Sequence, residues 1–167
     1  MITLKNAREK AVNLTESKIP KVLSLHHWKN IGVISGVIDY KIDNETGGKS
    51  GLYPDYVVIE MVTAAELKGR ITLKGIGEIR QEIIERLEDQ GKNLEDIAGI
   101  ESEAGSEILS NTNLLRKVGL IDLGYQELLK IKLMDMYLTT FWKVRNRLYN
   151  KLKEVRNNDE SRRNEEV

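Results

Sequence analysis

The chain of 167 residues contains no cysteine. Disulfide bonds, zinc sites with cysteine ligands and thiol catalysis are therefore excluded. The sequence also lacks any run of about 18 apolar residues, so we expect no membrane-spanning segment. Its first residues have no continuous apolar core of the signal-peptide kind, and we expect a cytoplasmic protein.

Histidine is nearly as scarce, because His26 and His27 are the two that the chain contains. Neighbouring side chains point apart on a strand and diverge by about 100° on a helix, so these two cannot easily share a metal ion. Trp28 follows them, and we expect both histidines to lie at the edge of the core. The sequence predicts no metal site and no cofactor.

Charge is balanced over the whole chain but unevenly placed. Residues 1–30 carry six basic and two acidic side chains, a net charge of +4. Residues 76–110 carry three basic and ten acidic ones, a net charge of −7. The opposite charges either neutralise each other inside one fold or pair between subunits and set an assembly register.

The end of the chain predicts one long amphipathic helix over residues 126–156. Apolar residues recur there at spacings of three and four, as in a helix that packs along a seam. We expect this seam to join copies of the chain into a homo-oligomer. Its residues are Ile131, Met134, Leu138, Phe141, Leu148 and Leu152.

The other side of the same helix is basic and aromatic. Eight basic residues of this segment face three acidic ones, which leaves a net charge of +5. Aromatic rings among cations are typical of surfaces that stack on bases, and equally of protein-binding hot spots. Nucleic acid and an acidic protein surface both remain as partners. The predicted binding residues are Lys143, Arg145, Arg147, Lys151, Lys153, Trp142 and Tyr149.

Strand patterns occupy the first half of the chain. Residues 31–42 alternate apolar and polar side chains and predict a half-buried strand. Residues 56–62 (YVVIEMV) are β-rich and nearly continuous, as in a buried central strand. Residues 70–73 are expected to add an edge strand, and the glycine-rich segment 43–54 is expected to be a mobile loop at a hairpin tip. Together they predict a small antiparallel sheet.

Helical spacing dominates the second half. A helix carrying Ile79, Ile83 and Leu87 is expected to end at Gly91, and Asn93 is expected to cap the next one. A third helix is expected near residues 106–117, before a cap at Asp122 for the last helix.

We therefore predict an α+β fold that is one domain overall. An N-terminal helix with a small sheet (1–75) is followed by a helical region (76–156) and a disordered tail (157–167).

Residues 76–121 also carry a motif. A first helix (EIRQEIIERLEDQG) is followed by NLEDIAGI and by a segment that ends in LLRKVGLID. This segment resembles a helix-turn-helix of the winged-helix kind, which implies contact with DNA. The expected recognition helix carries Glu103 and Glu107 with no cation before Arg116, whereas a helix in the major groove needs cations for the phosphates. A three-helix packing unit without a DNA role is the alternative.

Two further patterns are typical of phosphate chemistry. Residues 43–50 (DNETGGKS) approach the phosphate-binding loop GxxxxGK[ST], but no helix is predicted to follow, so a hairpin tip is favoured. Asp39, Asp55 and Glu60 are candidates for a metal-dependent nuclease site, but Val62 stands where its lysine is expected, and Lys41 could substitute only from another strand.

The combined expectation is a non-enzymatic binding and assembly protein. It would form homo-oligomers and contact nucleic acid or an acidic protein face through basic helical surfaces. A metal-dependent, phosphate-processing enzyme is one alternative, acting through Lys49, Ser50 and the three carboxylates. A structural subunit of a particle or filament is the other.

Overall fold

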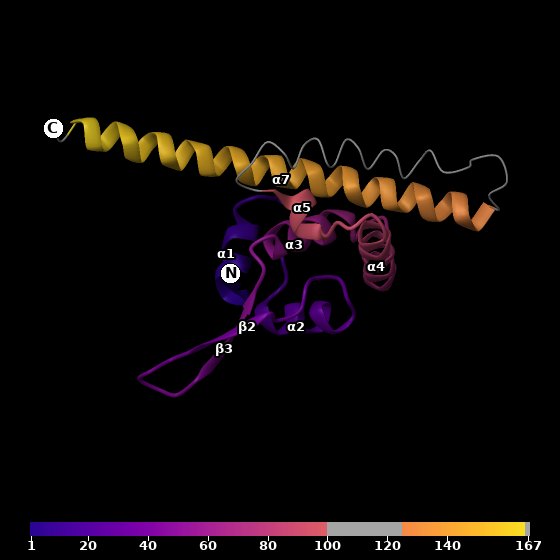
Figure 1. Ribbon diagram of the computed structural model, residues 1–167, viewed down its shortest axis with the longest axis horizontal. Coiled ribbons are helices and arrows are strands. Elements are labelled where there is room, and N and C mark those ends of the chain that lie inside the picture. Colours follow the sequence, from indigo (N-terminus) through magenta and orange to yellow (C-terminus); the bar gives the residue numbers. More distant parts are fainter. Residues whose placement is uncertain (100–124, 166–167) are drawn as a thin grey trace.

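The structure, a computed structural model, describes residues 1–99 and 125–165. It confirms the α+β class, with a small antiparallel sheet in the N-terminal half and a long helix at the end (Figure 1). The elements in chain order are β1 (Ile2–Thr3), α1 (Leu4–Val12), α2 (Val22–Asn30), β2 (Asp39–Ile42), β3 (Lys49–Tyr53), α3 (Val57–Leu67), α4 (Leu73–Asp89), α5 (Leu94–Ala98) and α7 (Tyr125–Glu165).

The sheet has the strand order β1-β3-β2, and β3 pairs with both neighbours in antiparallel fashion. Its main part is the hairpin of β2 and β3, which projects from the body of the molecule (Figure 1). The tip is the glycine-rich segment, as predicted. Gly47 adopts the left-handed conformation there, with φ of 68°, which a side chain would disfavour.

The predicted central strand over residues 56–62 is wrong, because that segment begins helix α3. Nine of the eleven residues of α3 are buried, so the helix is apolar on nearly every side. A short apolar run has no periodicity that separates a buried helix from a buried strand. Burial from all sides therefore removed the one pattern that distinguishes the two.

The two other predicted strands are also corrected. Within residues 31–42 only Asp39–Ile42 is a strand, and all four of its residues are exposed. Ile34 lies in the core, whereas Ile38 is 58% exposed, so the alternation does not mark one buried face. The predicted strand at 70–73 is the approach to α4, where the Thr72 side chain caps the helix by accepting from the Gly75 amide.

The helix signals between residues 79 and 98 are confirmed. Helix α4 ends just before Gly91, which has φ of 68°. Asn93 caps α5 in a reciprocal capping box with Asp96. The glycine after α4 and the asparagine cap before α5 are local signals, so the sequence alone located the end of one helix and the start of the next.

Helix α7 lies across α3 and α4 and extends past the body of the molecule at both ends (Figure 1). It continues to Glu165, so the segment 157–165, expected to be disordered, is helical instead. The helix expected near residues 106–117 and the cap at Asp122 lie outside the described residues. So does the part of the winged-helix-like segment beyond residue 99, and that resemblance stays a prediction.

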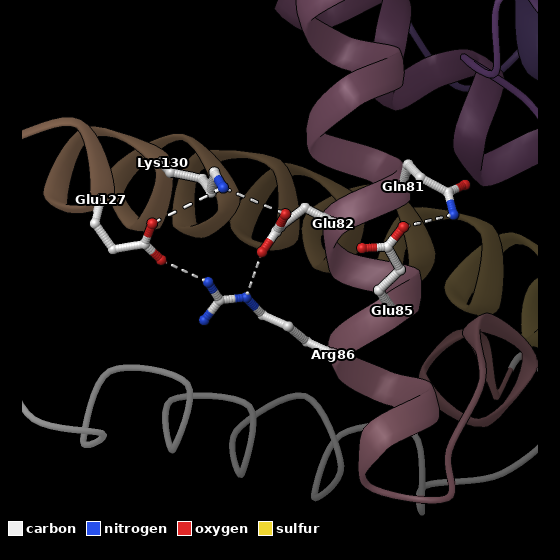
Figure 2. Close-up of polar contacts among 6 residues, drawn as sticks. All are labelled: Gln81, Glu82, Glu85, Arg86, Glu127 and Lys130. Carbon is white, nitrogen blue, oxygen red and sulfur yellow. Dashed lines mark hydrogen bonds and ion pairs between the residues drawn. The ribbon is translucent and has the colours of Figure 1, made fainter.

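Ion pairs join α4 to the first turns of α7. Arg86 donates to Glu82 on its own helix at 3.0 Å and to Glu127 on α7 at 2.8 Å (Figure 2). Lys130 of α7 lies 3.5 Å from the Glu82 carboxylate (Figure 2). Each helix thus contributes one carboxylate and one cation to this cluster. Part of the acidic charge of residues 76–110 is therefore neutralised within the chain, which is the first of the two interpretations given above.

Helix α4 also makes a close backbone contact with the end of α2. At Gly77, an added Cβ atom would lie 2.5 Å from the carbonyl oxygen of Ile31, far inside van der Waals contact. The neighbour is backbone and cannot rotate away. Only glycine allows α4 to approach the chain this closely.

We therefore expect Gly77→Ala to lower the free energy of unfolding by about 1–3 kcal/mol, because the added methyl group must push α4 away from the end of α2. Gly69→Ala is the matched control, since nothing lies within 4 Å of its added Cβ. Urea unfolding of both variants tests this. Equal stability of the two would contradict the close contact.

Candidate nucleic-acid interface

The predicted basic surface of α7 is largely engaged inside the protein, and Arg145 shows this most clearly. Its side chain is buried, and its guanidinium donates to the carbonyl oxygens of Ala98 and Gly99 at the end of α5. The same group lies over the rings of Trp142 and Tyr149, at 5.2 and 5.0 Å from their centroids. The predicted aromatic stripe therefore holds this arginine against α5.

Arg147 and Lys151 contact α3 and the residues that follow α1. Arg147 donates to both carboxylate oxygens of Glu66, at 2.7 and 2.9 Å, and to the carbonyl of Leu14. Lys151 donates to the carbonyl of Asn13, which ends α1. Cations at the last carbonyls of a helix satisfy acceptors that the helix leaves open.

The two remaining predicted cations are exposed. Lys153 lies with its Nζ atom 4.7 Å from the centroid of the Tyr149 ring, and Lys143 is near enough to Glu66 to influence its ionisation. Arg147 and Lys130 thus have acidic partners in the same chain, and Arg145 and Lys151 donate to backbone carbonyls. Lys132, Lys143 and Lys153 remain exposed on α7.

The predicted oligomer seam faces the protein's own core. Met134, Leu138, Phe141 and Leu148 are buried there, and Ile131 and Leu152 pack against the same cluster. The spacing of three and four was produced by packing on α3 and α4. Self-association stays a prediction, but these side chains are already covered.

The carboxylates proposed for a nuclease site are not brought together. Glu60 is inside the core with Arg80, Asp55 binds the N-terminal ammonium group, and Asp39 lies on the exposed hairpin. Within residues 1–99 and 125–165, no group of three acidic or histidine side chains is placed to hold a metal ion. Lys49 and Ser50 begin β3, where no helix amides converge on a phosphate.

A different surface, built on α2, has the composition expected for phosphate contact. Leu25 and Trp28 anchor the helix in the core, while Ser24, His26 and His27 face solvent. The expectation that both histidines lie at the core edge is therefore wrong, because only Trp28 turns inward. Residues 17–30 contain three lysines and no acidic residue.

The α2 surface was missed by sequence reasoning. The helix is nine residues long, and only two of its side chains are buried, so it gives no sustained helical period. The available signal is charge: residues 1–30 carry a net charge of +4, but the sequence does not assign it to one face of a helix.

The β2–β3 hairpin lies with α2 on the side of the molecule away from α7 (Figure 1). Residues 39–50 are all exposed, and Lys41, Lys49 and Tyr40 are among them. Asp43 shapes the tip by accepting from the amides of Glu45 and Thr46, and these hydrogen bonds hold its pKa below the ordinary value. The tip is therefore an ordered turn, and the mobile loop expected over residues 43–54 is corrected to a turn followed by β3.

The segment that joins α2 to β2 is held from inside the core. Glu60 of α3 and Arg80 of α4 form an ion pair with an Nε–Oε1 distance of 2.7 Å, and both side chains also bind this segment. Tyr137 is buried beside the pair, and burial raises the pKa of its phenol far above the usual range. The ionised groups that reach this part of the core are thus the carboxylate and the guanidinium.

The Glu66–Arg147 pair makes stability depend on pH. Partial burial opposes ionisation of Glu66, but hydrogen bonds from Arg147 and Thr15 outweigh it and hold the pKa of the carboxyl below its ordinary value. A lowered pKa in the folded state stabilises the protein above the unfolded-state pKa. That contribution is lost as the pH falls through the folded-state value.

We expect Glu66→Gln to cost about 1 kcal/mol at pH 7, since the guanidinium is partly exposed and screened by solvent. The difference from wild type should be constant above the unfolded-state pKa of glutamate, about 4.3, and should shrink as the pH falls below it and the wild-type carboxyl becomes protonated. Urea unfolding at several pH values measures this. Glu78→Gln on exposed α4 surface is the control and should change little; a pH-independent Glu66→Gln effect would contradict the assignment.

Comparison with known proteins does not place the chain in a family. It matches no protein-family model, no curated protein and no solved structure. Among the described residues, no helix combines the length and the apolarity needed to cross a membrane. Function is therefore inferred from the surfaces described above.

Proposed function

We propose that this protein is a non-enzymatic nucleic-acid-binding protein that contacts a DNA duplex with α2 and the β2–β3 hairpin. One observation carries the proposal: a helix flanked by lysines and a protruding two-stranded ribbon both lie on the side of the molecule away from α7 (Figure 1). The major groove of B-DNA accepts either an α-helix or a two-stranded ribbon. A helix and a ribbon exposed on the same side of the molecule can therefore engage one duplex.

The chemistry of α2 supports contact with both phosphates and bases. Lys18 and Lys21 precede the helix, and no acidic side chain occupies its first turn, so a phosphate meets no like charge there. Ser24, His26 and Asn30 are exposed and can hydrogen-bond to base edges. The helix follows α1 in the chain and packs on it, as the second helix of a helix-turn-helix does.

The hairpin adds less charge than α2 does. Residues 39–53 contain two lysines and three acidic side chains. Electrostatic attraction therefore comes from the lysines around α2, and the ribbon contributes shape and hydrogen bonding. Because the attraction comes from lysines that neutralise phosphates, binding should weaken as the salt concentration rises.

Self-association is the second part of the proposal. Helix α7 leaves Leu128, Leu129 and Val155 exposed near its ends, which extend past the body of the molecule (Figure 1). A helix end without apolar packing gains little stability from helix propensity alone, so we propose that a second copy of the chain covers these apolar side chains.

Sedimentation of the wild type and of a Leu128→Glu/Leu129→Glu variant tests this. We expect the wild type to form a concentration-dependent dimer and the variant to lose it. A monomer at all concentrations would refute it.

We expect a Lys18→Gln/Lys21→Gln/Lys29→Gln variant to bind duplex DNA about tenfold or more weakly at low salt, because each lysine neutralises one phosphate. The slope of log K against log salt should fall by roughly 0.9 for each contact removed. Fluorescence anisotropy with a labelled duplex at several salt concentrations measures both.

The matched control is Lys132→Gln/Lys143→Gln/Lys153→Gln, which removes three exposed lysines of α7 and the same total charge. It should leave affinity within about twofold of wild type, because distant surface charges are screened. Loss of binding in this variant alone would move the interface to α7. No binding of the wild-type protein at low salt would refute the proposal.

A further inference from the structure

We propose that the buried Glu60–Arg80 pair is the positioning element of this interface. By holding the segment that joins α2 to β2, it sets the arrangement of the helix relative to the ribbon. This inference rests on the proposed function, because it concerns how two elements meet one duplex. The pair itself touches no nucleic acid and is a core feature of α3 and α4.

The carboxylate of Glu60 is divided between two donors. Its Oε1 atom accepts from Nε of Arg80 at 2.7 Å, and its Oε2 atom accepts from the backbone amide of Ser35, also at 2.7 Å. Glu60 is fully buried. One oxygen therefore fixes the arginine and the other fixes the backbone between α2 and β2.

Arg80 binds the same segment with its other two nitrogens. Its Nη2 atom donates to Oγ of Ser35 at 2.9 Å, and its Nη1 atom donates to the carbonyl of Gly32 at 3.4 Å. Gly32 has φ of 77°, so the chain turns there in the left-handed conformation directly after α2. The planar guanidinium thus spans the start and the middle of the connection.

The contacts hold α2 from a second direction as well. The backbone of Gly77, one helical turn before Arg80, lies against the carbonyl of Ile31. Helix α4 therefore fixes the end of α2 by backbone contact and the following residues by hydrogen bonds. Beyond Ser35 the chain passes to Ile38, whose amide donates to Leu52 and begins the hairpin pairing.

Packing alone does not require a charged pair at this place. Replacing a buried ion pair with apolar side chains of similar volume is often neutral or stabilising, since desolvation of both charges is costly. Apolar side chains would join α3 to α4 equally well. They could not orient the Ser35 amide or the Gly32 carbonyl, and this is the distinctive contribution of the pair.

The consequence for binding is one of preorganisation. If the segment between α2 and β2 were loose, ordering it would oppose binding each time helix and ribbon met the duplex. The bound complex would still make the same phosphate contacts. Loss of the pair should therefore lower affinity at every salt concentration and leave the salt slope unchanged, unlike loss of a phosphate-binding lysine.

The test uses a Glu60→Leu/Arg80→Met variant, which removes both charges and leaves none unpaired. We expect its thermal midpoint to fall by several degrees, because the buried Ser35 amide loses its acceptor, while the protein stays folded, and its duplex affinity to fall about tenfold with an unchanged salt slope. In the absence of DNA, hydrogen exchange at the Ser35 amide should become about tenfold faster or more, because its buried acceptor is gone.

Two controls keep the result interpretable. Glu82→Gln/Arg86→Gln removes an ion pair of the same helix on the side facing α7, and it should leave DNA affinity unchanged (Figure 2). Arg80→Lys keeps the charge beside Glu60 but cannot form the three-way fork, and it should show an intermediate loss. If the neutral double variant fails to fold, the Arg80→Lys result decides.

The outcomes separate this inference from the proposed function. A wild-type protein that binds no duplex refutes the proposed function, and the inference falls with it even if Ser35 exchange changes. Wild-type binding together with unaltered affinity in a folded double variant refutes the positioning role alone. An affinity loss with a flattened salt slope would also refute it, since the number of phosphate contacts would then have changed.

Discussion

The burial of α3 is the constraint on which the rest of the structure depends. This helix is apolar on nearly every side, so it must be covered from several directions, and α1, α4 and α7 supply the cover. Its one buried charge, Glu60, then needs a partner in the core, which Arg80 provides from α4. The surface elements α2 and the hairpin are placed by what surrounds α3. A surface helix with two anchoring side chains could not hold that position by itself.

Charge has a different role here from the one that its distribution along the chain implies. In α7, Arg145, Arg147 and Lys151 satisfy backbone carbonyls at the ends of α5 and α1, and Arg147 also binds the carboxylate of Glu66. Lys18 and Lys21 are exposed before α2, and residues 17–30 contain no acidic side chain. The exposed lysines before α2 are therefore candidates for contact with a polyanion, whereas Arg145 and Arg147 of α7 are already engaged within the chain.

Local signals in the sequence predicted local structure well. Gly91 and Asn93 mark helix ends through their own chemistry, and the glycine-rich segment marks the hairpin tip; all three predictions are confirmed. The YVVIEMV segment failed because complete burial erases periodicity. The candidate interface could not be predicted from the sequence, because which basic side chains are engaged by partners within the fold depends on tertiary contacts. Nothing local reveals that Arg147 meets Glu66, whereas α2 is left open to solvent.

The bonds from α7 to the first helix also bear on how the chain is made. Arg147 donates to the carbonyl of Leu14, and Lys151 donates to that of Asn13, across more than 130 positions of sequence. A ribosome releases the beginning of the chain long before these partners emerge. Until then α3 lacks its longest cover and exposes apolar surface. Completion of the fold therefore waits for the synthesis of α7, and a chain interrupted before α7 would be a substrate for chaperones and proteases rather than a smaller working unit.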